Sequence, residues 1–125
     1  YKRQLERLCM FVQEKNNVFD LDWNNNGVKY KEVFFQAEKE FSAYNFEFAN
    51  TDTLLKNFEN TENECKSLLQ KNLSLPAYDQ CLKASHIFNL LDARGVIGVA
   101  ERTGYITRIR ELAKGCGALW LSSQS

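Results

Sequence analysis

Apolar side chains recur along most of the chain at the three- and four-residue spacing of amphipathic helices. This spacing predicts a first helix over residues 3–14 and a second from Tyr30 to Tyr44. The clearest amphipathic pattern predicts a third helix from about Thr53 to Lys71. Thr51 or Asp52 is expected to cap it by accepting from exposed backbone N–H groups.

Two more helices are predicted in the second half of the chain. One begins near Pro76, because proline lacks an N–H group that has no partner in a first helical turn. Its apolar residues spread around most of the helical wheel before Gly95 ends it, which is typical of a central helix. The last runs from about Val99 to Lys114 and on toward Leu121.

Two glycines are predicted to destabilise the end of that last helix. Gly115 and Gly117 each cost about 1 kcal/mol relative to alanine inside a helix, so its last turns are expected to fray. Between the first two helices, Val18–Trp23 alternates apolar and acidic residues, as in a short strand or an extended arm. Tyr44–Asn50 is expected to be a packed connection. The pattern therefore predicts an all-α bundle of about five helices.

Composition fits this interpretation. A chain of 125 residues with 44% hydrophobic and 13% aromatic residues suits one globular domain. Sixteen basic and sixteen acidic side chains cancel, so net charge argues neither for nor against a nucleic-acid partner. No apolar run is long enough to span a membrane. Because Tyr1 already lies in a helical pattern, the chain is expected to be a fragment of a longer protein.

Cysteine and histidine spacing favours structural roles. Cys9, Cys65, Cys81 and Cys116 form no C-x-x-C pair, so no metal site is expected. Each lies in an apolar segment, which indicates buried thiols in a reducing compartment. His86, the single histidine, lies in the most apolar helix and is expected to be a core residue rather than a catalytic one.

Two sets of polar side chains are candidates for a functional role. Asn89, Asp92 and Arg94 lie at the end of the helix that Gly95 terminates. A structural cluster is favoured, because interior charges must be paired, and Asp92 is expected to pair with Arg94 or Arg102.

The second group is basic and lies on the last helix. Its members could follow a phosphate backbone, but Glu101 and Glu111 interrupt them, so a solvated face is favoured. The set is Arg102, Arg108, Arg110 and Lys114.

Longer motifs resemble the C-terminal helical region of the α subunit of bacterial heterotetrameric glycyl-tRNA synthetase, a class II aminoacyl-tRNA synthetase. "YNFE", "LPAYD" and "FNLLDARG" occur in the family's order at Tyr44–Glu47, Leu75–Asp79 and Phe88–Gly95. A fourth motif, "ER..YI.RIR.LAK", covers Glu101–Lys114. The likeness extends over nearly the whole chain, which makes 1–125 one C-terminal helical domain.

At the N-terminus, "QLERLCMFVQ" resembles the third signature motif of class II synthetases. The resemblance makes Arg7 the arginine that contacts ATP, with Glu6 beside it in the site. A guanidinium offers planar, permanently charged donors to phosphate. Gln4 stands where the family has a glycine. The other two signature motifs and the glycine pocket would lie upstream, so no catalytic residue is expected within this fragment.

The resemblance implies the reaction of glycine with ATP, followed by transfer to tRNA-Gly. ATP with Mg²⁺ would serve the full α2β2 enzyme, and no cofactor is expected in the fragment. Its partners would be the β subunit, a second α subunit and tRNA-Gly, in the cytoplasm and away from membranes.

Within that enzyme the helical domain would brace the catalytic domain and contribute subunit or tRNA contacts. Asn89, Asp92 and Arg94 would form a polar latch that positions the last helix, and the basic set would offer contacts. The alternative is a non-catalytic helical module derived from a synthetase, which binds protein or RNA.

Overall fold

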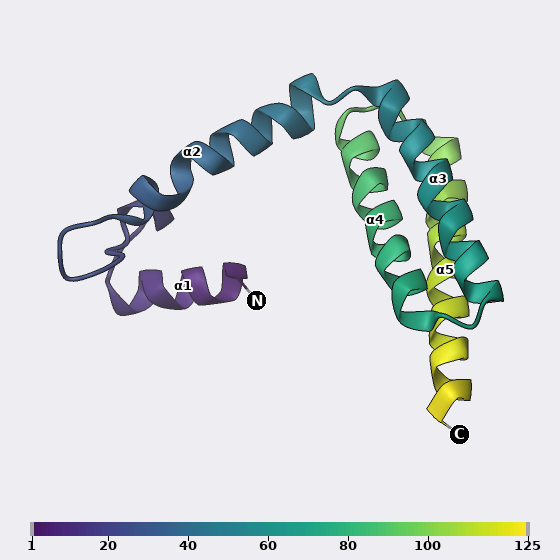
Figure 1. The fold of residues 1–125 in the computed structure, drawn as a ribbon. Helices are drawn as coiled ribbons and strands as arrows, with labels where there is room; N and C mark the ends of the chain where they lie inside the picture. Colours follow the sequence, from purple (N-terminus) through teal and green to yellow (C-terminus); the bar gives the residue numbers. More distant parts are fainter. Residues whose placement is uncertain (1, 125) are drawn as a thin grey trace. The chain divides into compact units, whose positions relative to one another are not determined.

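The computed structural model describes residues 2–124 and is helical, as predicted (Figure 1). Within that range the chain forms five α-helices and no strand. Its contacts divide it into two compact units, residues 1–44 and 45–125. The prediction of an all-α fold with five helices is therefore confirmed, and each unit is described by itself.

The first unit holds two helices and a short aromatic core. Helix α1 spans Lys2–Val12, the 3-10 turn η1 spans Val18–Asp20, and helix α2 spans Tyr30–Ala43. The ring centroid of Tyr30 lies 4.8 Å from that of Phe34 and 6.2 Å from that of Phe19. Tyr30 and Leu21 are the buried members of this small core. Contacts between aromatic rings stabilise this core beyond the gain from the surface that the rings remove from water.

The extended segment expected at residues 18–23 is mostly absent. The side chain of Asn17 accepts a hydrogen bond from the Phe19 N–H at 2.9 Å, which starts the η1 turn instead. Only Asp22 forms a β-bridge there, with Lys29. An asparagine that bonds to backbone two residues ahead favours a turn over a strand, which explains the difference.

Helix α1 is present as predicted, but its apolar side chains are not buried. The exposed fractions of Leu5, Leu8, Phe11 and Val12 range from 58% to 83%. The first unit has too few residues to cover more than one side of the helix. Large apolar side chains on α1 are therefore left exposed to water.

The long helices of the second unit pack into a bundle (Figure 1). These are α3 at Thr51–Gln70, α4 at Ser74–Ala93 and α5 at Val99–Gln124. Helix α4 packs against both others, as its nearly all-round apolar pattern predicted. A π-helical turn, Tyr44–Phe48, leads into the bundle, but its aromatic side chains are exposed, so the packed connection expected there is wrong. The core residues form two clusters, whose members include Leu54, Phe58, Phe88, Leu91 and Leu112.

The ends of α3 and α4 have clear local causes. Asn50 caps α3, and its side chain accepts from the Thr53 N–H at 3.0 Å. The expected cap, Thr51 or Asp52, is therefore wrong, because both already lie inside the helix. Gly95 ends α4 with a φ of +68°. The hydrogen bonds from Gly95 to Asp92 and from Val96 to Leu91 complete a Schellman motif.

Helix α5 does not fray at its glycines but continues to Gln124. A Cβ atom added to Gly115 would lie 3.0 Å from a methyl carbon of Leu69 on α3. The glycine therefore lets the two helices approach closely. Packing against α3 compensates for the low helix propensity of glycine, which is why the predicted fraying is wrong.

Candidate functional site

The residue pair that the resemblance links to ATP lies on α1. Arg7 is exposed, whereas Glu6 is half-buried and accepts a hydrogen bond from the hydroxyl of Tyr30 on α2. Burial, and after it this contact, raises the pKa of the Tyr30 hydroxyl to about 12. Glu6 thus has a structural partner inside the first unit, and the Arg7 guanidinium faces solvent.

A cleft of about 530 Å³ opens beside Glu6. Its walls come from α1, the η1 region and α2, and they are mainly apolar. Leu5 and Cys9 line one side, and Trp23, Tyr30 and Phe34 line the other. Such a cleft suits an apolar or aromatic group better than a triphosphate, because Glu6 and Asp22 are its charged lining groups and both are anionic.

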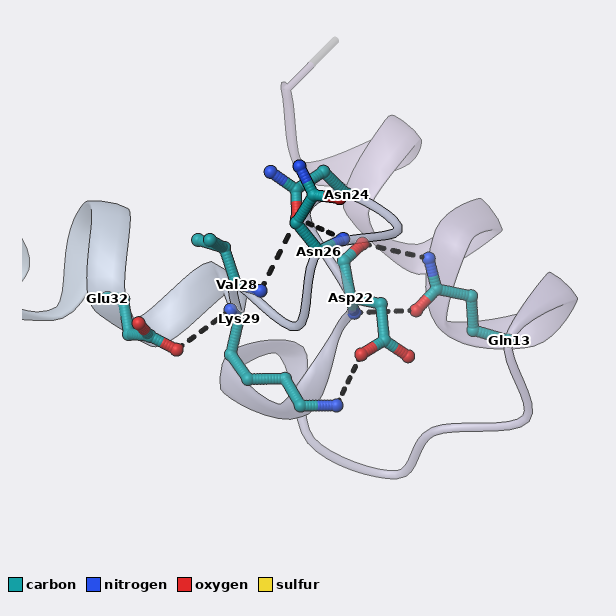
Figure 2. Close-up of polar contacts among 7 residues, drawn as sticks. All are labelled: Gln13, Asp22, Asn24, Asn26, Val28, Lys29 and Glu32. Atoms are coloured by element: carbon teal, nitrogen blue, oxygen red, sulfur yellow. Dashed lines mark hydrogen bonds and ion pairs between the residues drawn. The ribbon is translucent and has the colours of Figure 1, made fainter.

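A hairpin turn adjoins this cleft, and Figure 2 shows the polar contacts that hold it. The Gln13 amide donates to the Asp22 carbonyl at 3.1 Å and accepts from the Asp22 N–H at 2.8 Å. The Asp22 carboxylate pairs with the ammonium of Lys29, which lowers the pKa of that carboxyl. The Glu32 side chain accepts from the Lys29 N–H at 3.0 Å and holds the start of α2. These contacts join the hairpin to Gln13, which directly follows α1, and to the first turn of α2.

The polar cluster at the end of α4 divides between two partners. The Asp92 carboxylate pairs with the Arg102 guanidinium on α5 at 3.2 Å, one of the two expected pairings. Arg94 donates from Nη1 to the Phe46 carbonyl at 2.8 Å. Its Nε atom is buried and has no hydrogen-bond partner within residues 2–124. Asn89 is exposed. The cluster thus connects α4 to α5 and to the π-helical turn.

Arg108 is engaged inside the bundle. Its guanidinium binds both carboxylate oxygens of Glu62 on α3, with an Nε–Oε1 distance of 3.1 Å. It also lies 4.8 Å from the ring centroid of Phe58 and 5.1 Å from that of Tyr105. Hydrogen bonds from Arg108 and Lys66 hold the pKa of the Glu62 carboxyl below its usual value.

The other three residues of the basic set differ in their pairing and exposure. Arg102 is committed to Asp92, whereas the side chains of Arg110 and Lys114 are exposed on α5. Glu111 is exposed between them in sequence. The structure therefore reduces the expected basic face to two cations with an acidic neighbour.

The thiols and the histidine differ in part from expectation. Cys65, Cys81 and Cys116 are buried, one from each helix of the bundle, and burial raises the pKa of Cys65 to about 12. Cys9 is exposed on α1, so its predicted burial is wrong. His86 is exposed too, because it lies on the solvent side of α4, beside a groove that Asn57 and Asn60 of α3 also line. The core role expected for His86 is therefore wrong.

Among residues 2–124, no group of three or more His, Cys, Asp or Glu side chains is placed to hold a metal ion. No helix in the same range is long and apolar enough to cross a membrane. The two residues that the resemblance links to ATP are thus an exposed arginine and a carboxylate that already binds Tyr30.

Sequence reasoning missed Glu62 and Tyr30. The amphipathic pattern of α3 predicted no role for Glu62, yet this charged residue is buried in the bundle, with 6% of its surface exposed. A signal was available in retrospect, because a glutamate at the same helical face as Phe58 and Cys65 lies four and three residues from apolar positions. Tyr30 was assigned only as the start of α2.

A comparison with protein families tests the resemblance drawn from the four motifs. The family model described as the glycyl-tRNA synthetase alpha subunit matches residues 2–125. The match includes the α1 segment with Glu6 and Arg7 and the whole three-helix bundle. Because it covers nearly the entire chain, this chain belongs to the glycyl-tRNA synthetase alpha subunit family.

Proposed function

We propose that this chain is the helical part of a glycine–tRNA ligase α subunit, where it supports assembly and substrate contacts and holds no catalytic residue. In the full α2β2 enzyme the reaction joins glycine to tRNA-Gly with ATP as the energy source, in the cytoplasm. The family match over residues 2–125 is the single observation that carries this proposal.

The surface of α1 supports a bracing role. Leu5, Leu8 and Phe11 are large apolar residues with more than half of their surface exposed. Arg7 lies on the same helix and is exposed as well. We infer that α1 packs against the catalytic part of the enzyme, which would bring Arg7 to the ATP phosphates. Arg7 would then bind and orient ATP, whereas Glu6 would hold the helix through Tyr30.

Activity of the chain alone tests the inactive-fragment proposal. Glycine-dependent exchange of pyrophosphate into ATP is measured for the 125-residue chain and for an intact α2β2 enzyme of the family. We expect exchange only from the intact enzyme, because one arginine and one occupied carboxylate cannot position a triphosphate. Exchange by the isolated chain above the enzyme-free rate would refute the proposal.

The polar latch is tested in the complete enzyme. Asp92→Ala removes the carboxylate that connects α4 to Arg102 on α5. If this pair positions α5 for subunit contacts, the substitution lowers thermal stability or weakens association of α with β. The latch is wrong if both quantities are unchanged. Asp79→Ala is the matched control, because Asp79 pairs with Lys83 within α4 alone, at 3.1 Å.

RNA binding is the second candidate, and the exposure of Arg110 and Lys114 favours it. Two cations that neutralise phosphates would make the binding of tRNA-Gly weaken as salt increases. Substituting both by alanine should flatten that salt dependence, by about one unit of slope for each phosphate that is no longer neutralised. Arg108→Ala would act differently, since Arg108 is bound to Glu62. If the double variant keeps the original slope, these cations do not bind the RNA.

A further inference from the structure

The tip of the hairpin in the first unit carries the sequence Asn24-Asn25-Asn26-Gly27. Figure 2 shows how one of these asparagines is held. The Asn24 Oδ1 atom accepts hydrogen bonds from the Asn26 N–H at 2.9 Å and from the Val28 N–H at 3.4 Å. Gly27 adopts a φ of +84°, a conformation that favours glycine.

Asn26 and Gly27 present two reactive groups to water. Both residues are exposed. Within residues 2–124, neither the Asn26 side-chain amide nor the Gly27 N–H makes a hydrogen bond. A Cβ atom added to Gly27 would meet nothing within 4 Å, so no neighbouring side chain shields the backbone here. The carboxamide and the following backbone nitrogen are therefore both accessible.

We propose that Asn26 is a site of spontaneous deamidation. The deprotonated backbone nitrogen of Gly27 attacks the side-chain Cγ of Asn26 and forms a new N–C bond. The carboxamide C–N bond breaks, and its nitrogen leaves as ammonia, giving a cyclic succinimide. Water then opens the ring at either carbonyl and yields aspartate or isoaspartate. No oxidant or metal is needed, and hydroxide supplies the base.

The neighbouring asparagines are less suited to the same reaction. Attack requires the backbone nitrogen of the next residue to approach the carboxamide, and only Asn26 is followed by a residue without a Cβ. The Asn24 carboxamide is also fixed by its two hydrogen bonds. Asn25 is exposed but precedes another asparagine. The structure and the sequence thus single out the same position.

The modification changes the hairpin that holds residues 22–29. Isoaspartate inserts an additional carbon into the main chain inside a turn closed by the Trp23–Val28 hydrogen bond of 2.8 Å. That turn carries the Asp22–Lys29 bridge and, through Asp22, the contact with Gln13. The isoaspartyl form is therefore expected to loosen the hairpin from Gln13, whereas aspartate adds only a negative charge at its tip.

Peptide mapping of the folded chain tests the proposal. The protein is incubated at mildly alkaline pH and then digested with trypsin, which cleaves after Lys15 and Lys29. The single peptide 16–29 contains Asn16, Asn17 and the three hairpin asparagines. Mass spectra with fragmentation locate each conversion. We expect deamidated peptide to accumulate with time at Asn26, as separable aspartyl and isoaspartyl forms, the latter a substrate for isoaspartyl methyltransferase.

Two variants and one peptide serve as controls. Asn26→Gln should abolish the early mass change, because the longer side chain disfavours the five-membered ring, and Asn25→Gln should leave it in place. Synthetic peptide 16–29 shows that the conditions support the reaction. If the free peptide deamidates at Asn26 while the folded chain does not, or if the folded chain reacts faster at another asparagine, the proposal is overturned.

Discussion

Arg108 on α5 binds both carboxylate oxygens of Glu62 on α3, and this pair joins the two helices that flank the bundle's central one. Only 7% of the Glu62 side chain is exposed, against 38% for Arg108. The guanidinium also lies over the ring of Phe58, so its planar face is covered by apolar surface. A two-point geometry of this kind fixes the rotation of α5 relative to α3.

Removing one partner of this pair should destabilise the bundle. Glu62→Ala leaves Arg108 without its carboxylate, and hydrogen bonds to charged groups contribute roughly 1.5–3 kcal/mol. Because Arg108 keeps partial access to water, we expect a loss of about 2 kcal/mol in the free energy of unfolding, measured by urea denaturation. Glu64→Ala is the matched control on α3, exposed and expected to change stability by about 0.5 kcal/mol or less. Equal losses of unfolding free energy in the two variants would contradict the expectation that the Glu62–Arg108 pair stabilises the bundle.

The same pair predicts a pH dependence. The pKa of Glu62 is lowered from its ordinary value of 4.5 by Arg108 and Lys66. A lowered pKa in the folded state means that stabilisation is complete above pH 4.5 and is lost as the pH falls below it. The bundle should therefore lose stability on acidification, and Glu62→Gln should flatten that loss. If the variant shows the same acid dependence as the original chain, Glu62 is not the group responsible.

The helices were predictable because their signals are local. Spacing alone gave all five, and Pro76 and Gly95 marked the limits of α4 correctly. The predictions that failed concern residues whose surroundings depend on contacts far away in the sequence. The burial of Glu62 depends on Arg108, 46 residues away, and the length of α5 depends on Leu69 beside Gly115. The spacing of apolar residues along the chain carries no information on such contacts.

The candidate site was predictable only by resemblance. Nothing in the spacing of Glu6 and Arg7 indicates ATP, and the structure places one against Tyr30 and the other in solvent. His86 and Cys9 show the limit of the apolar-segment argument. His86 lies on the solvent side of α4, because a helix apolar nearly all round does not reveal which side will be covered, whereas Cys9 lines an open cleft on α1.

The contact between Arg94 and the π-helical turn should contribute measurably to the second unit. Arg94→Ala removes the hydrogen bond to the Phe46 carbonyl and should cost about 1–2 kcal/mol, measured by thermal unfolding. Asp92→Asn weakens an ion pair with both partners partly exposed and should cost less than about 1 kcal/mol. Faster amide hydrogen exchange at residues 45–49 in Arg94→Ala, but not in Asp92→Asn, would show that Arg94 stabilises the π-helical turn. An equal or larger loss in Asp92→Asn would contradict this order.

Thiol reactivity should separate α1 from the bundle. Cys9 is exposed, whereas burial raises the pKa of Cys65 and Cys81 and keeps both thiols protonated. The thiolate is the reactive form. We expect an aromatic disulfide reagent to titrate one thiol in the native chain and all four after denaturation. Cys9→Ser should abolish the native reaction. Rapid reaction of a second thiol in the native state would show that the bundle opens.

Alkaline titration should identify Tyr30 within the first unit. Its pKa is raised from 10.0 to about 12 by burial and by the contact with Glu6. A raised pKa means that the stabilisation is present below pH 10 and is lost as the pH rises toward 12. Tyr30→Phe should therefore delete the latest step of tyrosinate absorbance and lower stability near neutral pH by about 1 kcal/mol. Tyr44→Phe, at an exposed tyrosine, should change neither. Ionisation of Tyr30 together with the other tyrosines would show that the hydroxyl is free of Glu6 in solution.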